Sequence, residues 1–343
     1  MTTSTIKRSS AARRIMALLA SIMLVATLAS FAGAGKAQAG NRDFLRADAT
    51  GQCEWDPVAY WVQRCDVWSQ SMQRTIPVQI QPAKNGGNAG LYLLDGLRAT
   101  DQGNAWLHDV NAAKTYVDSN ITLVMPVGGA ASFYADWDGP ATYDFVNPVT
   151  YKWETFLTQE LKGYLADNFG VAPNNNSIAG LSMGGTAAIA LGGQHRDQFR
   201  QVLSFSGFLT TSVPGAQTFM RLAMLDAGNF NINAMYGSMF NPRRFENDPM
   251  NQIQNLHGAD VYVSAASGIE GPQDAHYLPE HKASGAALEA ASNLTTRAWE
   301  SAARVGGLNP GVDYPATGLH NWEQFGYQLE KTRPRVLDVM NAW

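Results

Sequence analysis

Charged residues are scarce in this chain. Asp, Glu, Lys and Arg make up 16% of its 343 residues, and the formal net charge is −4. No basic patch is present, so binding to nucleic acid through its phosphates is not expected. No run of like charge, internal repeat or low-complexity segment is present either, so a charged disordered tail is not expected.

Cysteine is almost absent. The chain has only Cys53 and Cys65, twelve positions apart. An isolated pair in an oxidising compartment usually forms a disulfide, and this one would hold the segment before the first long strand. No histidine lies nearby to complete a metal site or to activate a thiol, and no metal or cofactor is expected.

Aromatic residues, in contrast, are plentiful, with nine Trp and twelve Tyr. In a secreted protein such a set can form a surface that faces carbohydrate or lipid. Core packing is the simpler explanation for most of them.

The N-terminal segment has the pattern of a secretory signal peptide. Basic residues at positions 7, 8, 13 and 14 precede an apolar run over 15–32, and Ala37-Gln38-Ala39 follows. A membrane anchor is the alternative, but the A-x-A cleavage pattern favours secretion. We therefore expect residues 1–39 to be a signal peptide and residues 40–343 to form one domain, secreted or held in the cell envelope.

Short apolar runs alternate with helical patterns along the rest of the chain. Runs bounded by Gly and Pro are typical of strands buried on both faces of a parallel sheet, and they occupy 74–83, 89–97, 121–129, 177–182, 201–207 and 260–268. Helices are expected over 152–170, from Ser182 to about His195, over 284–307 and from about Trp322. This order predicts an α/β fold with a mostly parallel sheet and helices on both faces.

The sequence Gly180-Leu181-Ser182-Met183-Gly184 has the pattern of a nucleophile elbow, a tight turn between a strand and a helix. Glycines are needed there because a side chain would collide with the neighbouring strand or helix. Met183 would open the helix, so its amide would face the site as an unpaired donor. The motif alone is weak evidence for catalysis. A serine nucleophile also needs a base, and the base needs an orienting acid.

His320 is the histidine best placed to act as a base. It lies in a loop before the last helix, which is where a serine hydrolase of this chain order carries its base. His195 lies down the helix from the elbow and faces away from the nucleophile, and His257 precedes a predicted strand, at the wrong end of the sheet. His276 and His281 fall in an insertion rich in Pro and Gly.

Three acidic residues remain open as partners of His320. Glu270 and Asp274 follow the strand at 260–268, where a serine hydrolase usually carries its acid, and chain position alone favours this loop. Glu289 lies further on, early in the next helix.

Five stretches resemble the antigen 85 mycolyltransferase family, and its corynebacterial members most of all. They are YLLDGLRA (92–99), LVMPVGGAASFYADW (123–137), YKWETFLTQEL (151–161), GLSMGG (180–185) and HNWEQFG (320–326). The resemblance covers the chain from about Arg74 to its C-terminus. It implies an α/β-hydrolase fold and transfer of a mycoloyl group between trehalose esters and cell-wall arabinogalactan.

The resemblance also implies roles for individual residues. It makes Ser182 the nucleophile, His320 the base and Glu289 the acid, against the choice made from chain position. It assigns the oxyanion hole to the backbone amides of Leu97 and Met183. The positions that contact trehalose in the family correspond to Asp95, Arg98 and, more loosely, Trp322.

The chain also departs from the family. The mycobacterial members carry their cysteines elsewhere, and residues 278–286 differ. Residues 111–121 do not match the stretch linked to fibronectin binding, so that activity is not expected.

The expected reaction is acyl transfer through a serine acyl-enzyme, from trehalose monomycolate or its monocorynomycolate counterpart to a sugar hydroxyl. Two alternatives remain: a secreted serine carboxylesterase without preference for a transfer acceptor, and a catalytically silent envelope-binding protein.

Overall fold

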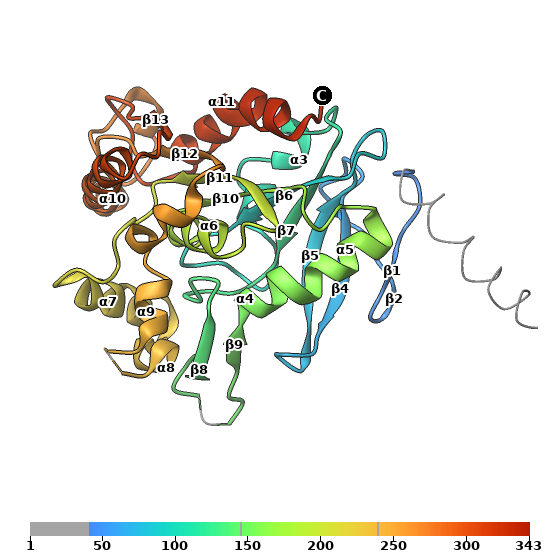
Figure 1. Cartoon of the computed structure of the whole chain (residues 1–343), viewed down its shortest axis with the longest axis horizontal. Helices are drawn as coiled ribbons and strands as arrows, with labels where there is room; N and C mark the ends of the chain where they lie inside the picture. Colours follow the sequence, from blue (N-terminus) through green and yellow to red (C-terminus); the bar gives the residue numbers. More distant parts are fainter. Residues whose placement is uncertain (1–40, 145, 239) are drawn as a thin grey trace, which may run out of the picture.

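A nine-stranded mixed sheet forms the centre of the protein (Figure 1). The computed structural model describes residues 41–144, 146–238 and 240–343, so the predicted signal peptide lies outside the described residues. The strand order is β13-β12-β11-β10-β6-β7-β5-β4-β3. The α/β-hydrolase architecture expected from the sequence is confirmed.

Six neighbouring strands of the sheet are parallel: β6 (Ala89–Leu94), β7 (Ile121–Pro126), β10 (Asn176–Leu181), β11 (Phe199–Phe205), β12 (Asp260–Ser264) and β13 (Gly311–Asp313). Every residue of β6, β7 and β10 is buried. This burial on both faces explains why their sequences are mostly apolar, although β7 contains Thr122 and β10 begins with Asn176 and Ser177.

The other end of the sheet is antiparallel. It contains β5 (Arg74–Gln81), β4 (Gln63–Ser69) and β3 (Glu54–Trp55), and a separate pair, β1 (Ala47–Asp48) and β2 (Gly51–Gln52), lies beside it. The prediction of a parallel strand over 74–83 was therefore wrong in direction, because a strand's sequence records its burial and not its orientation. The predicted Cys53–Cys65 disulfide is present and ties the start of this end to β4.

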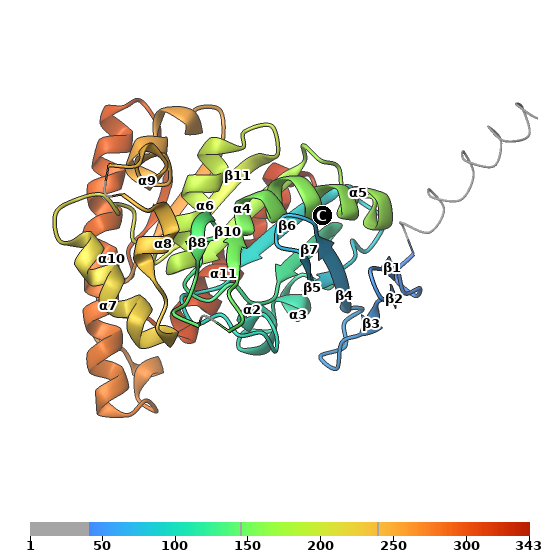
Figure 2. The ribbon, with the colours of Figure 1, turned by 90° about the horizontal axis from the view of Figure 1, so that it is seen from below.

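Helices cover both faces of the sheet (Figures 1 and 2). One face packs against a set that includes α4 (Trp153–Thr155), α5 (Leu161–Phe169) and α6 (Met183–Gln194). The other face packs against α2 (Ala105–His108), α3 (Ala112–Thr115) and α11 (Trp322–Met340). The remaining elements are β8 (Asp136–Pro140), β9 (Thr150–Lys152), α7 (Ala216–Gly228), α8 (Ile232–Tyr236), α9 (Pro242–Glu246), α10 (Pro279–Val305) and the 3-10 turns at 249–252, 254–256 and 272–274.

Two helices differ from the prediction in detail. The segment expected as one helix over 152–170 contains a π-helical turn at Phe156–Glu160 between α4 and α5. Helix α10 begins at Pro279, five residues before the expected start, so His281 lies in its first turn and not in a loop. Proline is tolerated in the first turn of a helix because the amide it lacks would have no partner there.

None of the helices in the described ranges is long and apolar enough to span a bilayer. The parallel strands end together at one edge of the sheet, and the segments that follow β6, β10, β11 and β12 therefore converge. This edge carries the candidate active site.

Candidate active site

Ser182 sits in a strained turn between β10 and α6. Its backbone has φ 51° and ψ −121°, a conformation that a residue with a side chain rarely adopts. Its amide donates to the carbonyl of Phe205 on the neighbouring strand at 2.9 Å. Strain of this kind persists only where surrounding structure holds it, and it pushes the side chain of Ser182 out of the regular backbone.

The two flanking glycines allow this turn to form. A Cβ on Gly180 would lie 2.3 Å from the backbone of Gly184, and a Cβ on Gly184 would lie 2.5 Å from the carbonyl oxygens of Leu94 and Asp95. Both contacts are with backbone, which cannot move aside. The Gly-x-Ser-x-Gly pattern is therefore a steric requirement of packing α6 against β6 and β10.

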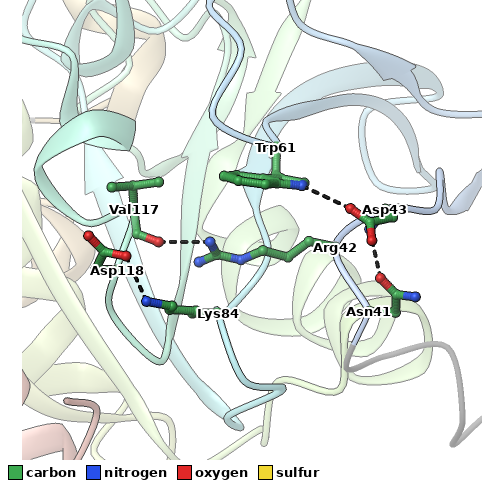
Figure 3. Close-up of a pocket in the computed structure, with 7 residues that line it drawn as sticks. All are labelled: Asn41, Arg42, Asp43, Trp61, Lys84, Val117 and Asp118. Atoms are coloured by element: carbon green, nitrogen blue, oxygen red, sulfur yellow. Dashed lines mark hydrogen bonds and ion pairs between the residues drawn. The ribbon is translucent and has the colours of Figure 1, made fainter.

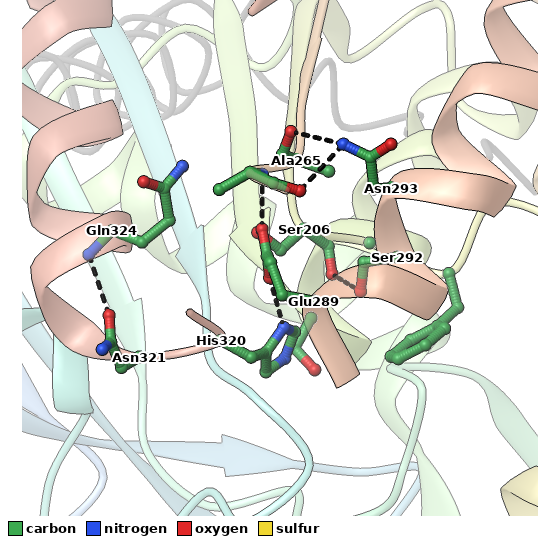
Figure 4. A network of polar contacts seen from close by, with 12 residues as sticks. Ser206, Ala265, Glu289, Ser292, Asn293, His320, Asn321 and Gln324 are labelled. Carbon is green, nitrogen blue, oxygen red and sulfur yellow. Dashed lines mark hydrogen bonds and ion pairs between the residues drawn. The ribbon is translucent and has the colours of Figure 1, made fainter. Parts of the chain in front are cut away.

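Glu289 and His320 form a buried pair (Figure 4). The Oε2 atom of Glu289 lies 2.8 Å from Nδ1 of His320, and Glu289 is fully buried. Its Oε1 atom accepts from the hydroxyl of Ser206 at 2.7 Å and from the amide of Ala266 at 2.6 Å. The carboxylate thus has a donor on each oxygen, which fixes its orientation and that of the imidazole ring.

Helix α10 is fastened to the ends of β11 and β12 by further polar side chains. Ser292 donates to the carbonyl of Ser206 at 3.0 Å, and Asn293 donates to the carbonyls of Ala265 and Ala266 at 3.0 and 2.8 Å. The sequence did not reveal these residues, because their roles depend on contacts across 27 to 86 positions. The Glu-x-x-Ser-Asn spacing of residues 289–293 gives no signal by itself.

The other two acidic candidates lie elsewhere. Glu270 is exposed and pairs with Lys282 at 2.6 Å. Asp274 is fully buried, but its carboxylate accepts from the side chain of Asn321 at 2.6 Å and the amide of Gly271 at 2.8 Å. Asp274 therefore holds the residue after His320, whereas Glu289 holds the ring itself.

Phe208 connects the serine turn with the histidine. Its amide donates to the hydroxyl of Thr186 at 2.9 Å, and that hydroxyl lies 3.3 Å from the carbonyl of Ser182. The ring of Phe208 lies 6.2 Å from the ring of His320. Thr186 and Phe208 thus connect the turn of Ser182, which is 8% exposed, with the ring of His320.

Residues within the stretch 123–137 form hydrogen bonds with the loop that contains Leu97. The carbonyl of Leu97 accepts from the amide of Ala131 at 2.9 Å, and the amide of Asp95 donates to the hydroxyl of Tyr134 at 2.9 Å. The sulfur of Met183 accepts from the amide of Phe133 at 3.3 Å. One segment therefore sets the position of Leu97 relative to Met183.

Asp95 is buried, with 4% of its surface exposed. One carboxylate oxygen accepts from the amide of Gly96 at 2.7 Å and the other from the amide of Ala105 at 2.9 Å. Desolvation raises the pKa of Asp95 to about 6, against the opposing effect of these two hydrogen bonds. In this arrangement the carboxylate faces the protein backbone and braces the Leu97 loop.

Arg98 and Trp322 are the other residues assigned to substrate contact, and both are less buried than Asp95. Arg98 is exposed and forms an ion pair with Asp226 at the end of α7. Trp322 is half-buried, and its ring packs edge-on against Trp106 and Phe325. In the described ranges no group of three or more His, Cys, Asp or Glu side chains is arranged to hold a metal ion.

Residues 69–336 match the family model described as putative esterase. The chain is 36% identical to the diacylglycerol acyltransferase/mycolyltransferase Ag85B of Mycolicibacterium smegmatis, over 96% of each chain. It is 36% identical to the Ag85C protein of the same description from Mycobacterium avium, over 81% of this chain and 78% of the relative.

Solved structures with the same fold include MPT51 of Mycobacterium tuberculosis. It has a TM-score of 0.70 and 28% identity, and the match covers 81% of this chain and 98% of that one. The fluorophosphonate-binding serine hydrolase F of Staphylococcus aureus has a TM-score of 0.59 at 15% identity, over 81% and 97% of the two chains, and shares the fold.

Proposed function

The chain belongs to the antigen 85 family of mycolyltransferases, and we propose that it transfers mycoloyl groups from trehalose esters through an acyl-enzyme on Ser182. The observation that carries this proposal is the strained turn at Ser182 at the same edge of the sheet as the buried Glu289–His320 pair. A nucleophile, a base and an orienting acid are the three groups that acyl transfer through serine requires.

In the proposed reaction, Glu289 accepts from Nδ1–H of His320, which leaves Nε2 as the proton acceptor. His320 takes the proton of the Ser182 hydroxyl as Oγ attacks the ester carbonyl of trehalose monomycolate or monocorynomycolate. The C–O bond to trehalose then breaks, and His320 returns the proton to the leaving sugar oxygen. A second sugar hydroxyl attacks the acyl-enzyme by the same steps in reverse and restores Ser182.

The backbone amides of Leu97 and Met183 are proposed to bind the oxyanion. Met183 is the first residue of α6, where amides have no partner within the helix. Donors held in place before the reaction stabilise the developing charge without reorganising. Three hydrogen bonds support this role because they fix the loop: from Ala131 to the carbonyl of Leu97, from the amide of Asp95 to Tyr134, and from the amide of Ala105 to the carboxylate of Asp95.

An apolar face beside the site supports a long acyl chain as the transferred group. Phe219, Leu222 and Leu225 on α7 are 42%, 63% and 38% exposed. The ring of Phe219 packs against that of Phe208, which also touches His320. We propose that the acyl chain runs from Ser182 along this face of α7.

Trehalose is proposed to bind at the rim near Arg98 and Trp322. Each carboxylate oxygen of the buried Asp95 accepts from a backbone amide, so Asp95 is proposed to brace the loop beside the sugar. The acceptor hydroxyl is proposed to come from trehalose or from cell-wall arabinogalactan. Secretion is proposed from the pattern of residues 1–39, and the Cys53–Cys65 disulfide supports an oxidising compartment.

The experiment is to incubate the purified chain from residue 40 onward with trehalose monocorynomycolate, with and without added trehalose, and to identify the products. Trehalose dicorynomycolate is the expected product, in an amount that rises with added trehalose. Release of free acid alone, unchanged by trehalose, would show a carboxylesterase instead. No reaction, together with no labelling of Ser182 by a fluorophosphonate, would show a silent binding protein.

A further inference from the structure

The tryptophans of this protein divide into two groups. Four of the nine are completely buried: Trp106, Trp137, Trp153 and Trp299. Of the four that are exposed, three lie within 54–69 at the antiparallel end of the sheet: Trp55, Trp61 and Trp68 are 45%, 42% and 48% exposed. Core packing accounts for the first group and leaves this exposed group unexplained.

Two adjoining hollows lie at this end of the sheet. One, of about 340 Å³, is lined by Arg42, Trp61 and Asp118 among others (Figure 3). The other, of about 450 Å³, is lined by Trp55, Tyr60 and Trp61. Trp61 and Asp43 line both hollows, so the two form one continuous surface feature. Both hollows are shallow and open, which suits a ligand that lies along the surface.

The ring of Trp61 is held in place. Its Nε1 donates to Asp43 at 3.1 Å, and the guanidinium of Arg42 lies 5.4 Å from the ring centre. Arg42 is itself fixed, because it donates to the carbonyls of Pro82 at 2.8 Å and Val117 at 2.7 Å. The exposed indole of Trp61 is therefore already ordered, so packing of a ligand against it costs little side-chain conformational entropy.

The backbone beneath these aromatic residues is strained. Ala59, Tyr60 and Trp61 have φ values of 73°, 51° and 60°, three consecutive residues with side chains in the left-handed region. The turn is held by a local bond from the amide of Val62 to the carbonyl of Ala59 at 3.0 Å and by Gln81, whose side chain donates to the carbonyl of Tyr60 at 2.8 Å. Strained residues that display exposed side chains are typical of ligand-binding positions.

The charges around the first hollow cancel. Arg42 and Lys84 are balanced by Asp43 and Asp118, and Lys84 pairs with Asp118 at 2.7 Å. The second hollow adds Asp56, so across both hollows three carboxylates face two cations, and the lining offers no net attraction to an anion. Carboxylates and an indole together suit a neutral sugar, whose hydroxyls donate to the carboxylates while its apolar face packs on the ring.

We propose that this surface, which we call the Trp55–Trp61 platform, binds a neutral carbohydrate chain at a site separate from the acyl-transfer site. Arg42 binds carbonyls beside the amino end of β7, whereas Ser182 follows the carboxyl end of β10. Five inter-strand steps separate β10 from β3, or about 24 Å. The platform could hold the protein on a polysaccharide while the acyl site remains free.

The test is affinity electrophoresis of the chain from residue 40 onward in native gels containing soluble arabinogalactan, with dextran and polygalacturonate as further probes. We expect retardation by arabinogalactan, at least tenfold weaker binding for Trp61→Ala, and weaker binding for Trp55→Ala. Trp68→Ala, equally exposed but outside both hollows, should bind within twofold of wild type.

Trp61→Phe keeps an aromatic face and should retain most of the binding, and thermal unfolding of each variant checks its fold. If Trp61→Ala does not fold, Trp55→Ala decides the question. No retardation by either neutral polysaccharide, retardation only by polygalacturonate, or an equal loss in Trp68→Ala would overturn the proposal. Transfer from trehalose monocorynomycolate is measured separately, so failure of the platform leaves the proposed reaction untouched.

Discussion

At the β10–β13 end of the sheet, polar side chains are buried and bonded to one another, whereas at the β3–β5 end aromatic side chains lie exposed on a strained turn. Glu289, Ser206 and Asp274 are completely buried at the first end. At the second end, the Cys53–Cys65 disulfide and Arg42 hold Trp55 and Trp61 at the surface. We propose that the first arrangement serves acyl transfer and that the second serves contact with a carbohydrate.

The largest effect expected at the first end follows removal of the nucleophile. Ser182→Ala should lose transfer activity by several orders of magnitude, because no other group can form the acyl-enzyme. The variant should fold normally and still bind arabinogalactan through the Trp55–Trp61 platform. Turnover of trehalose monocorynomycolate measures the loss, and residual activity within tenfold of wild type would contradict the role of Ser182.

The next largest effect is expected for the acid. Glu289→Gln should lower turnover by up to about ten-thousand-fold, because the amide no longer holds His320 in the form that accepts the serine proton. Glu270→Gln, on the surface, is the matched control and should stay within tenfold of wild type. Asp274→Asn should also stay within tenfold, since Asp274 holds Asn321 and not the ring.

Activity must be compared with thermal stability for each of these variants, because Glu289 also fastens α10 to Ser206 and Ala266. An active Glu289→Gln protein beside an inactive, folded Asp274→Asn protein would reverse the assignment of the acid.

Asp95 offers a test in which pH is the variable. Its folded pKa, about 6, lies above the ordinary value of 3.8 because of burial, so the folded state holds the proton more tightly than the unfolded state. The raised pKa of Asp95 therefore adds to the free energy of unfolding in full below about pH 4, and this added stability is lost as the pH rises to about 6. Asp95→Asn should lack this decline, so the variant should gain about 3 kcal/mol relative to wild type between pH 4 and pH 7.

Urea unfolding of both proteins at several pH values measures this difference. The loss of one amide partner in Asp95→Asn adds an offset that does not vary with pH. A difference that stays constant from pH 4 to pH 7 would show that burial does not perturb Asp95.

The smallest effect on activity is expected at the antiparallel end. Replacing Cys53 and Cys65 with Ser should lower the free energy of unfolding by about 3 kcal/mol, because the disulfide closes a short loop in the unfolded chain. Transfer activity at 25 °C should stay within twofold of wild type, since the disulfide lies far from Ser182. A large loss of turnover in a folded variant would mean that the two ends are coupled.

The sequence by itself determined the parts of this protein that depend on local sterics and on burial. Apolar runs marked the parallel strands because both faces of those strands are covered, and Gly180 and Gly184 marked the turn at Ser182 because only glycine fits against the backbone there. Cys53 and Cys65 could be paired because no other cysteine exists.

Chain position did not identify the acid that reaches His320; the family resemblance named Glu289, and its contact with His320 is seen only in the tertiary structure. Glu270, Asp274 and Glu289 have the same chemistry in the sequence, and only the packing of α10 against β11 and β12 brings Glu289 to Nδ1. Tertiary structure also decided the reversed direction of β5, the inward orientation of Asp95 and the exposure of Trp55 and Trp61. The physical reason is the same in each case: these properties arise from contacts between residues far apart in the chain, and no local pattern records them.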